Sequence, residues 1–320
     1  MHTNIQLQMQ LRSYSYQKIF SPCIALCIVF ICLLSPRKSM GQDSISEINK
    51  TRLALVSSSI GGFYVGGMIY LSEVWYRDQP RAPFTFYNDN AGWNQMDKWA
   101  HAYVAYHQSR VGYHALRWSG VSKNKALWFG GTLGFVLQLP IEIFDGMYEG
   151  YGFSWGDVWA NTAGSALFIA QEYFFDEQPV KLKFSFYPSE YAPIRPRALG
   201  ENIVENLFMD YNSQSYWLST NIHRFWKNDY IPKWLNIALG YSAGGMLGEF
   251  ENPRFISGQL APEFARYRQF FISPDIDFAA IPTTKKWLKG FFEALNLLKM
   301  PAPAIEYNSV FGWQFHFIYM

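Results

Sequence analysis

The chain has 320 residues, of which 16% are charged and 19% are aromatic, and its formal net charge at pH 7 is +2. This near-neutral balance, without a dense run of Lys or Arg, gives no electrostatic basis for binding nucleic acid. Few charges and many Trp and Tyr side chains are typical of a protein that meets a membrane interface, with an aromatic-rich water-soluble core as the alternative.

The N-terminal segment has the layout of an export signal. An apolar run from Ile19 to Leu34 follows basic residues and precedes the small-residue end Ser39-Met40-Gly41. We therefore expect residues 1–41 to be a signal peptide. Two basic residues lie between the apolar run and the expected cut, which leaves an uncleaved anchor as the alternative.

All three cysteines lie in this apolar run, at Cys23, Cys27 and Cys32. Lipid attachment needs a small residue just before the cysteine. Cys27 follows Leu26 and Cys32 follows Ile31, so both fit poorly. A mature chain that has lost this segment has no disulfide and no thiol nucleophile.

The first helix is expected within a charge-free run, Leu53 to Ser72, which is about long enough to span a bilayer. Gly62 and Gly66 lie inside it at the spacing that lets a neighbouring helix approach closely. A buried helix in a water-soluble bundle is the alternative.

Three further helices are expected, over residues 95–118, 126–141 and 158–171. The first is amphipathic. Pro140 should kink the second, because it removes a backbone donor. Gly164 lies among small residues of the third and should allow close packing. The sequence thus predicts a membrane-associated bundle of about four helices over residues 50–178.

After residue 179 the apolar pattern alternates, as in half-buried strands. Strands are expected at 181–187, 215–222, 234–241 and 268–278, and one helix at 285–298. A last strand should place these residues on one face: Phe311, Trp313, Phe315, Phe317 and Tyr319. The fold class is therefore α+β, with an antiparallel β-meander domain over residues 179–320. An outer-membrane barrel is the alternative, although about six strand candidates are fewer than the eight such barrels usually need.

Ionisable side chains interrupt the apolar helices. Asp97 and His101 are four residues apart and share a helix face. A carboxylate beside an imidazole fixes its tautomer and raises its basicity, as a general base or metal ligand requires. Alternatively, Asp97 only offsets the helix dipole in the first turn, with Asn94 as N-cap.

Two more acidic pairs follow. Glu142 and Asp145 are three apart and repel unless a proton, cation or metal lies between them, which could raise one pKa into the acid–base range. Asp145 could instead cap the following loop. Ser154 and Asp157 match a capping box, whereas the amide of Asn161 lies in an apolar helix and must find partners.

These motifs together resemble a known family. The order Asp97-Lys98-x-x-His101, Glu142-x-x-Asp145-Gly146 and Ser154-Trp155-x-Asp157-x-x-x-Asn161 is similar to the uncharacterised YfiM-like group described as predicted periplasmic lipoproteins, and more distantly to VanZ-like membrane proteins. The resemblance covers residues 50–175 and implies a helical envelope protein. Since the family's activity is not established, it assigns no catalytic role.

The sequence thus predicts an exported, membrane-associated cell-envelope protein of unassigned activity, on the periplasmic side or at the outer membrane. A buried polar cluster, including Asp97, Asp145, Ser154 and Asn161, would organise the bundle. Expected partners are membrane lipid and other envelope proteins, and neither nucleic acid nor a cofactor is expected.

The alternative is a hydrolase or transferase acting on a lipid-linked or cell-wall substrate, so whether the chain is an enzyme stays open. His101 would be the base, Glu142 the acid or second base and Lys98 the anion stabiliser, with Asp157 orienting the others. A divalent metal held by His101, Glu142 and Asp145 is a third hypothesis.

Overall fold

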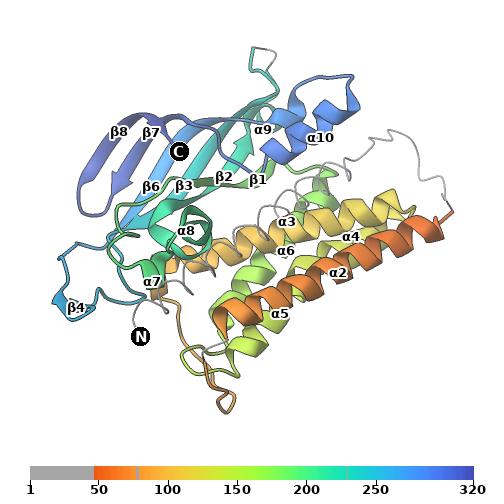
Figure 1. The fold of residues 1–320 in the computed structure, drawn as a ribbon. Coiled ribbons are helices and arrows are strands. Elements are labelled where there is room, and N and C mark those ends of the chain that lie inside the picture. Colours follow the sequence, from red (N-terminus) through yellow and green to blue (C-terminus); the bar gives the residue numbers. More distant parts are fainter. Residues whose placement is uncertain (1–46, 77–78, 229) are drawn as a thin grey trace.

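The computed structural model describes residues 47–320, apart from residues 77–78 and 229. Helices occupy the N-terminal part of this range and an antiparallel sheet dominates the C-terminal part, which confirms the mixed α+β class. Figure 1 shows the sheet lying along one side of the helical bundle. The expected signal peptide, residues 1–41, lies outside the described residues.

The helical part has five helices among the described residues, rather than about four. They are α2 (Lys50–Trp75), α3 (Met96–Trp118), α4 (Lys123–Gly131), α5 (Leu133–Asp145) and α6 (Trp155–Phe175). The extra division falls at Thr132, after Gly130 and Gly131, because glycine is a weak helix former. The expected kink at Pro140 is not a helix boundary, since Pro140 lies inside α5.

Glycines let α5 and α6 lie directly against the backbone of α3. A Cβ on Gly164 would lie 2.1 Å from the carbonyl oxygen of Ala102, and one on Gly134 would lie 2.0 Å from that of Ala105. No real side chain fits at such distances. The backbones therefore touch, and short polar side chains on the three helices can reach one another.

Gly62 and Gly66 have no such role in the part of the chain that the structure describes. No heavy atom lies within 4 Å of a Cβ built on either glycine, so the expected close helix approach is not found. Instead, α2 contacts the bundle through Val56, which packs with Ala115 of α3. Its outward side is apolar and exposed at Leu55, Val65 and Ile69.

Six strands form the main sheet. They are β1 (Val180–Phe186), β2 (Gln214–Asn221), β3 (Leu235–Gly244), β6 (Tyr267–Ile276), β7 (Ala302–Asn308) and β8 (Gly312–Tyr319). The order β1-β2-β3-β6-β7-β8 is an antiparallel meander, and the hairpin β4 (Phe255–Ile256) and β5 (Gln259–Leu260) is inserted between β3 and β6. Short helices join the strands: α7 (Pro196–Leu199), α8 (Ile203–Met209), α9 (Ile222–Phe225) and α10 (Lys286–Leu295).

The sequence did not predict β7, because Pro301 and Pro303 favour a turn. In the structure the pairing of β7 with β8 is irregular between Ala302 and Ala304. An irregularity of this kind accommodates a proline in a strand, since it relieves the need for a backbone donor. The same irregularity changes the face of the sheet on which the last side chains of β8 lie.

Trp313, Phe315 and Phe317 are exposed, but Tyr319 lies on the other face and packs on Trp217 and Phe271. The expectation that all the alternating aromatic residues of this segment share one face is therefore wrong at its last residue. The register shift between β7 and β8 is the physical reason.

The two faces of the sheet differ from those of an ordinary half-buried sheet. The apolar face packs on α3 where Phe184 and Tyr216 meet Tyr103. The opposite face is buried and combines aromatic side chains such as Trp217 and Phe271 with polar ones, including a fully buried ion pair between Lys183 and Asp275 at 2.8 Å. Beyond the reach of α3 the apolar face is exposed, at Leu239, Phe270, Ile305 and Phe315.

Candidate functional site

Polar side chains from three helices and one loop meet at the start of α3. We call the following set the polar cluster: Asp89, Asp97, Lys98, His101, Glu142, Asp157 and Asn161. All but Asp89 were singled out in the sequence. The loop before α3 supplies Asp89, α3 supplies Asp97, Lys98 and His101, α5 supplies Glu142, and α6 supplies Asp157 and Asn161.

An unusual backbone sets the entry into α3. Trp93, Asn94 and Gln95 all have positive φ angles, of 47°, 50° and 66°. Such angles are costly for residues with a Cβ and persist only where surrounding contacts hold them. Tyr241 donates to the Asn94 carbonyl, and Gln95 donates to that of Asn90 at 2.7 Å. The expected N-cap at Asn94 is therefore wrong, and α3 begins at Met96.

Lys98 lies between three carboxylates. Its Nζ is 2.8 Å from Asp89 Oδ2, 3.1 Å from Asp97 Oδ2 and 2.7 Å from Asp157 Oδ1. Burial alone would lower the pKa of Lys98, but the charges of Asp97 and Asp157 outweigh burial and raise it. The ammonium is therefore charged and already contacts three carboxylates.

His101 lies at the centre of the polar cluster. Its Nδ1 is 3.2 Å from Asn161 Oδ1, and Nδ1–H donates to that amide. Its Nε2 faces Asp97 Oδ1 at 3.6 Å and Asp157 Oδ1 at 3.7 Å. Burial would lower the pKa of His101, but the neighbouring carboxylates, Asp97 first, outweigh burial and raise it to about 9.

Glu142 closes the inner end of the polar cluster. Its side chain is 1% exposed, and Oε1 lies 3.6 Å from His101 Nδ1, beyond hydrogen-bond distance. Glu142 Oε1 and Asn161 Nδ2 have no hydrogen-bond partner among the described residues. Burial raises the pKa of Glu142 to about 8, against the attraction of His101.

The two aspartates beside His101 differ in charge state. Burial would raise the pKa of Asp97, but His101, Lys98 and a hydrogen bond from Tyr211 outweigh burial and lower it to about 2. Burial and the charge of Asp97 raise the pKa of Asp157 to about 7, against His101 and Lys98. Near neutral pH, Asp97 is therefore ionised and Asp157 is close to half-protonated.

Two predicted residues lie at the edge of this group. Asp145 accepts a hydrogen bond from Tyr76 of the α2 end, and burial raises its pKa to about 6. Ser154 is the N-cap of α6, since its Oγ accepts from the backbone N–H of Asp157 at 3.1 Å. The Ser154 hydroxyl donates to Asp89 at 2.6 Å, so it also links the cap to the polar cluster.

Sequence reasoning missed Asp89, Tyr76 and Tyr211. Asp89 lies in the Asn88-Asp89-Asn90 segment, which signals only a turn. Tyr211 precedes β2 and reaches Asp97 from the C-terminal part of the chain, 114 residues away. No pattern within one segment indicates a contact at such a separation.

Asp97, His101 and Asp157 each offer a donor atom within 4.8 Å of the others, a spacing compatible with a metal ion. This set differs from the predicted set of His101, Glu142 and Asp145. However, the ammonium of Lys98 contacts the carboxylates of both Asp97 and Asp157. A divalent ion would have to displace that ammonium or lie beside it, which disfavours a metal here.

The polar cluster can therefore exchange protons. It reaches solvent on the side of Asp97 and Lys98, whose side chains are partly exposed, and ends internally at Glu142. The fold and this site together define an α+β protein with a semi-enclosed acid–base cluster at the junction of three helices.

One family model matches the chain, that of the family described as predicted periplasmic lipoprotein (DUF2279), over residues 85–172. The matched range contains the whole polar cluster. The match covers about a quarter of the chain and supports an exported protein of the cell envelope. Neither the curated proteins nor the solved structures include a match to this chain.

Proposed function

We propose that this exported envelope protein is membrane-associated and that its polar cluster is an acid–base site acting on a lipid-linked or cell-wall substrate. A single observation carries the proposal. Glu142 is buried with one oxygen lacking a hydrogen bond, and that oxygen faces the imidazole of His101 at 3.6 Å.

A network that only holds helices in register should satisfy its own polar groups. Here Glu142 Oε1 and Asn161 Nδ2 lack hydrogen-bond partners among the residues described. Carboxyl groups also outnumber basic groups. The polar cluster holds Asp89, Asp97, Glu142 and Asp157, with Asp145 at its edge, against Lys98 and His101. Unsatisfied, strongly titrating groups of this kind favour a functional site over a packing device.

The charge states assign roles that differ from the sequence-based ones. With a pKa of about 9, His101 is mostly an imidazolium at neutral pH and acts as the proton donor. Asp157, with a pKa near 7, supplies the acceptor when ionised. Glu142 also holds a proton near neutral pH, so it can accept one from His101 only after its own proton has left. Lys98 neutralises carboxylates rather than stabilising an anionic intermediate.

The excess of carboxyl groups over basic groups also restricts the charge that the reacting group of the substrate can carry. A phosphate would be repelled by the ionised aspartates, while Lys98 is already taken by three of them. The reacting group is therefore a neutral one, such as a sugar hydroxyl or an amide, which can accept a proton from His101.

Membrane association is supported by the helical part. Two segments, Lys50–Ile69 and Lys123–Asp145, are long and apolar enough to cross a membrane by length and composition. The first segment is the stronger candidate for membrane contact, because only 6% of its most apolar stretch is buried in the molecule. The second is interrupted at Thr132, and its Glu142 side chain is buried. We assign the lipid contact of this part to α2.

The test uses His101→Gln and Glu142→Gln, with Glu149→Gln on the following exposed loop as the matched control. Each variant is assayed for thermal stability and for cell sensitivity to detergent and to a glycopeptide. An acid–base site predicts increased sensitivity of both variants, with the stability of Glu142→Gln unchanged or raised, because this glutamine removes a buried titrating group. Parallel loss of stability and function would instead show that the polar cluster only holds the helices together.

A further inference from the structure

Three segments distant in the sequence leave the main sheet at the same end. Val180, the first residue of β1, pairs with Thr220 near the end of β2, and Leu235, the first of β3, pairs with Ile276 at the end of β6. The C-terminus of α6, the α9 connection and the α10 segment therefore gather at this end, where Figure 1 shows α9 and α10 as neighbours. We call residues 173–175, 222–228, 230–234 and 281–295 the basic–aromatic end.

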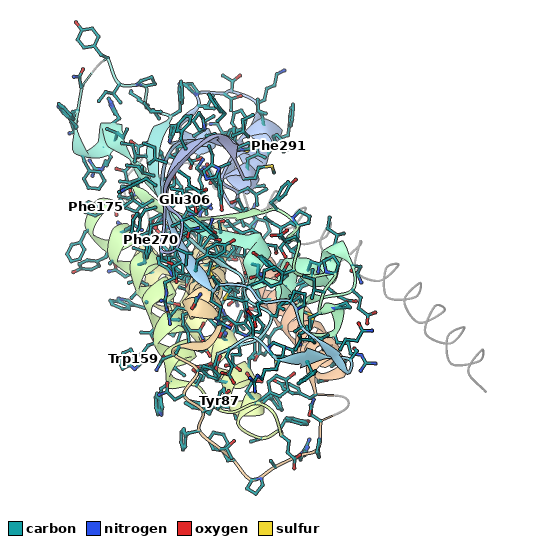
Figure 2. All side chains as sticks on the ribbon, turned by 90° about the vertical axis from the view of Figure 1, so that its left-hand side faces the viewer. Tyr87, Trp159, Phe175, Phe270, Phe291 and Glu306 are labelled. Carbon is teal, nitrogen blue, oxygen red and sulfur yellow. The ribbon has the colours of Figure 1, made fainter. Side chains whose placement is uncertain are left out.

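Large aromatic side chains of these segments point into solvent. Tyr230 is 94% exposed, Trp287 is 69% exposed and Phe174 is 73% exposed. Further exposed rings in the same segments are Tyr173, Phe175, Phe225, Trp226 and Phe291. In Figure 2, Phe175 and Phe291 lie in the upper half of the view, whereas Trp159 and Tyr87 lie in the lower half.

Basic side chains accompany these rings. Residues 222–234 contain Arg224, Lys227 and Lys233 with one acid, and residues 281–295 contain Lys285, Lys286 and Lys289 with one acid, Glu293. Arg224 is paired with Glu177, so the lysines supply the charge considered below. Glu293 is already paired with Arg110 of α3. The lysines of α10 and its N-terminal flank therefore have no acidic partner within their own segment.

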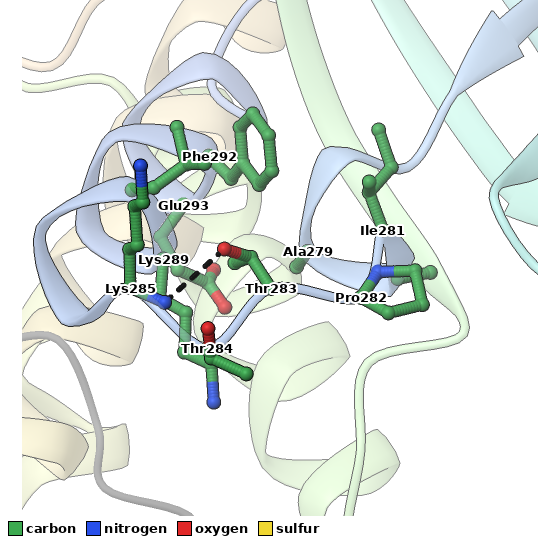
Figure 3. Close-up of a pocket in the computed structure, with 11 residues that line it drawn as sticks. Ala279, Ile281, Pro282, Thr283, Thr284, Lys285, Lys289, Phe292 and Glu293 are labelled. Atoms are coloured by element: carbon green, nitrogen blue, oxygen red, sulfur yellow. Dashed lines mark hydrogen bonds between the residues drawn. The ribbon is translucent and has the colours of Figure 1, made fainter.

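The surface beside α10 is hollowed. A groove of about 750 Å³ runs between α10 and the preceding turn, and its walls include Ile281, Leu288 and Phe292. Thr283, Lys285 and Lys289 line its polar side, as Figure 3 shows. The groove is remote from the polar cluster: Glu293 on its wall pairs with Arg110, nine residues or roughly 13 Å along α3 from His101.

We propose that the basic–aromatic end binds the headgroup region of an anionic phospholipid membrane. Exposed Trp and Phe side chains with lysines at one helix face are the pattern of an element that lies in a membrane interface. Charge complementarity selects anionic lipid, since each basic residue near such a surface is attracted by it. The inference rests on the proposed membrane association and adds a second contact, from the C-terminal part of the chain.

The test is flotation of the purified full-length protein with two kinds of vesicle. One kind is phosphatidylcholine alone, and the other is phosphatidylcholine and phosphatidylglycerol in equal parts. The variant is Lys286→Gln with Lys289→Gln, and the matched control is Arg197→Gln with Arg254→Gln, which removes two exposed charges at the opposite end of the sheet. The lysine variant should partition onto the anionic vesicles roughly tenfold less than the wild type, with the difference lost at high salt.

Replacement by arginine at the same two positions should restore binding, since the charge is kept. If the Lys286→Gln, Lys289→Gln variant and the Arg197→Gln, Arg254→Gln control bind anionic vesicles equally well, the inference is overturned. The proposed membrane association would remain intact. Absence of the wild type from both kinds of vesicle would overturn the membrane association as well. An unchanged thermal midpoint of the lysine variant confirms that folding is not the cause.

Discussion

At the scale of single residues, Glu142 Oε1 faces His101 at 3.6 Å without a direct hydrogen bond between them. One carboxyl oxygen has no hydrogen-bond donor among the residues described, and the side chain is shielded from water. The protonated acid is therefore favoured near neutral pH, while the imidazole beside it is favoured as a cation. Because the two groups lie close together and lose protons in overlapping pH ranges, they titrate as a coupled pair, and a proton can pass between them only after one has been lost from the pair.

This arrangement makes stability depend on pH. The pKa of Glu142 rises on folding from 4.5 to about 8, and that of His101 from 6.5 to about 9. The folded state thus binds more protons than the unfolded state between these values, so the free energy of unfolding falls as pH rises. The two shifts together predict a loss of about 4–5 kcal/mol between pH 6.5 and pH 9.

Denaturant unfolding of the wild type and of the His101→Gln, Glu142→Gln double variant at both pH values checks this expectation. The double variant should lose most of the pH dependence, because neither glutamine titrates. Glu149→Gln, an exposed change, should keep the wild-type slope. An identical slope in all three proteins would contradict the assigned charge states.

At the scale of elements, α3 carries the site because its neighbours come unusually close. Gly164 of α6 lies against the carbonyl of Ala102 and Gly134 of α5 against that of Ala105. A short carboxylate on α6 can then reach a lysine or histidine on α3. The left-handed residues before Met96 fix the start of the helix and hence the direction of Asp97 and Lys98.

The two kinds of glycine predict opposite effects of the same substitution. Gly164→Ala should destabilise the protein by about 2–3 kcal/mol, since its Cβ would overlap backbone that cannot move easily. Gly62→Ala on α2 meets no atom within 4 Å, and alanine favours the helix, so it should be neutral or stabilising by about 0.5–1 kcal/mol. Thermal unfolding of both variants tests this difference. Equal destabilisation by Gly164→Ala and Gly62→Ala would contradict the prediction.

At the scale of the whole molecule, the exposed apolar surface of the described residues includes the outward side of α2 and the part of the sheet that α3 does not cover. Contiguous apolar surface of this kind marks an interaction site. For α2 we propose lipid, because the segment is long enough to enter a bilayer and contributes little to the packed interior.

Polar substitutions on α2 separate its contribution from that of the basic–aromatic end. Val65→Gln with Ile69→Gln should weaken binding to vesicles of phosphatidylcholine alone, because two exposed apolar side chains lose their affinity for lipid. The Lys286, Lys289 variant should bind these neutral vesicles as the wild type does. Unaltered neutral-vesicle binding of the α2 variant would show that α2 is not the lipid contact.

Local pattern carried much of the fold. Alternation located β1, β2, β3, β6 and β8 to within a few residues, and apolar patterning located α2, α3, α6 and α10, because both depend on neighbours in sequence. The short helices α7, α8 and α9 were not predicted. The pattern failed at β7, where proline is tolerated at an irregular pairing. It also failed at Thr132, where the helix is interrupted, whereas the kink was expected at Pro140. In both cases tertiary pairing outweighs local preference.

By itself the sequence determined the α+β class, the order of the main elements and six of the seven residues of the polar cluster. These six could be identified because charged and polar side chains within apolar helices are costly to bury unless they pair with one another. Tertiary structure alone decided that Asp89 and Tyr211 join them, that Lys98 is already neutralised and that His101 is cationic. Such charge states depend on distances between segments far apart in the chain, which no local pattern encodes.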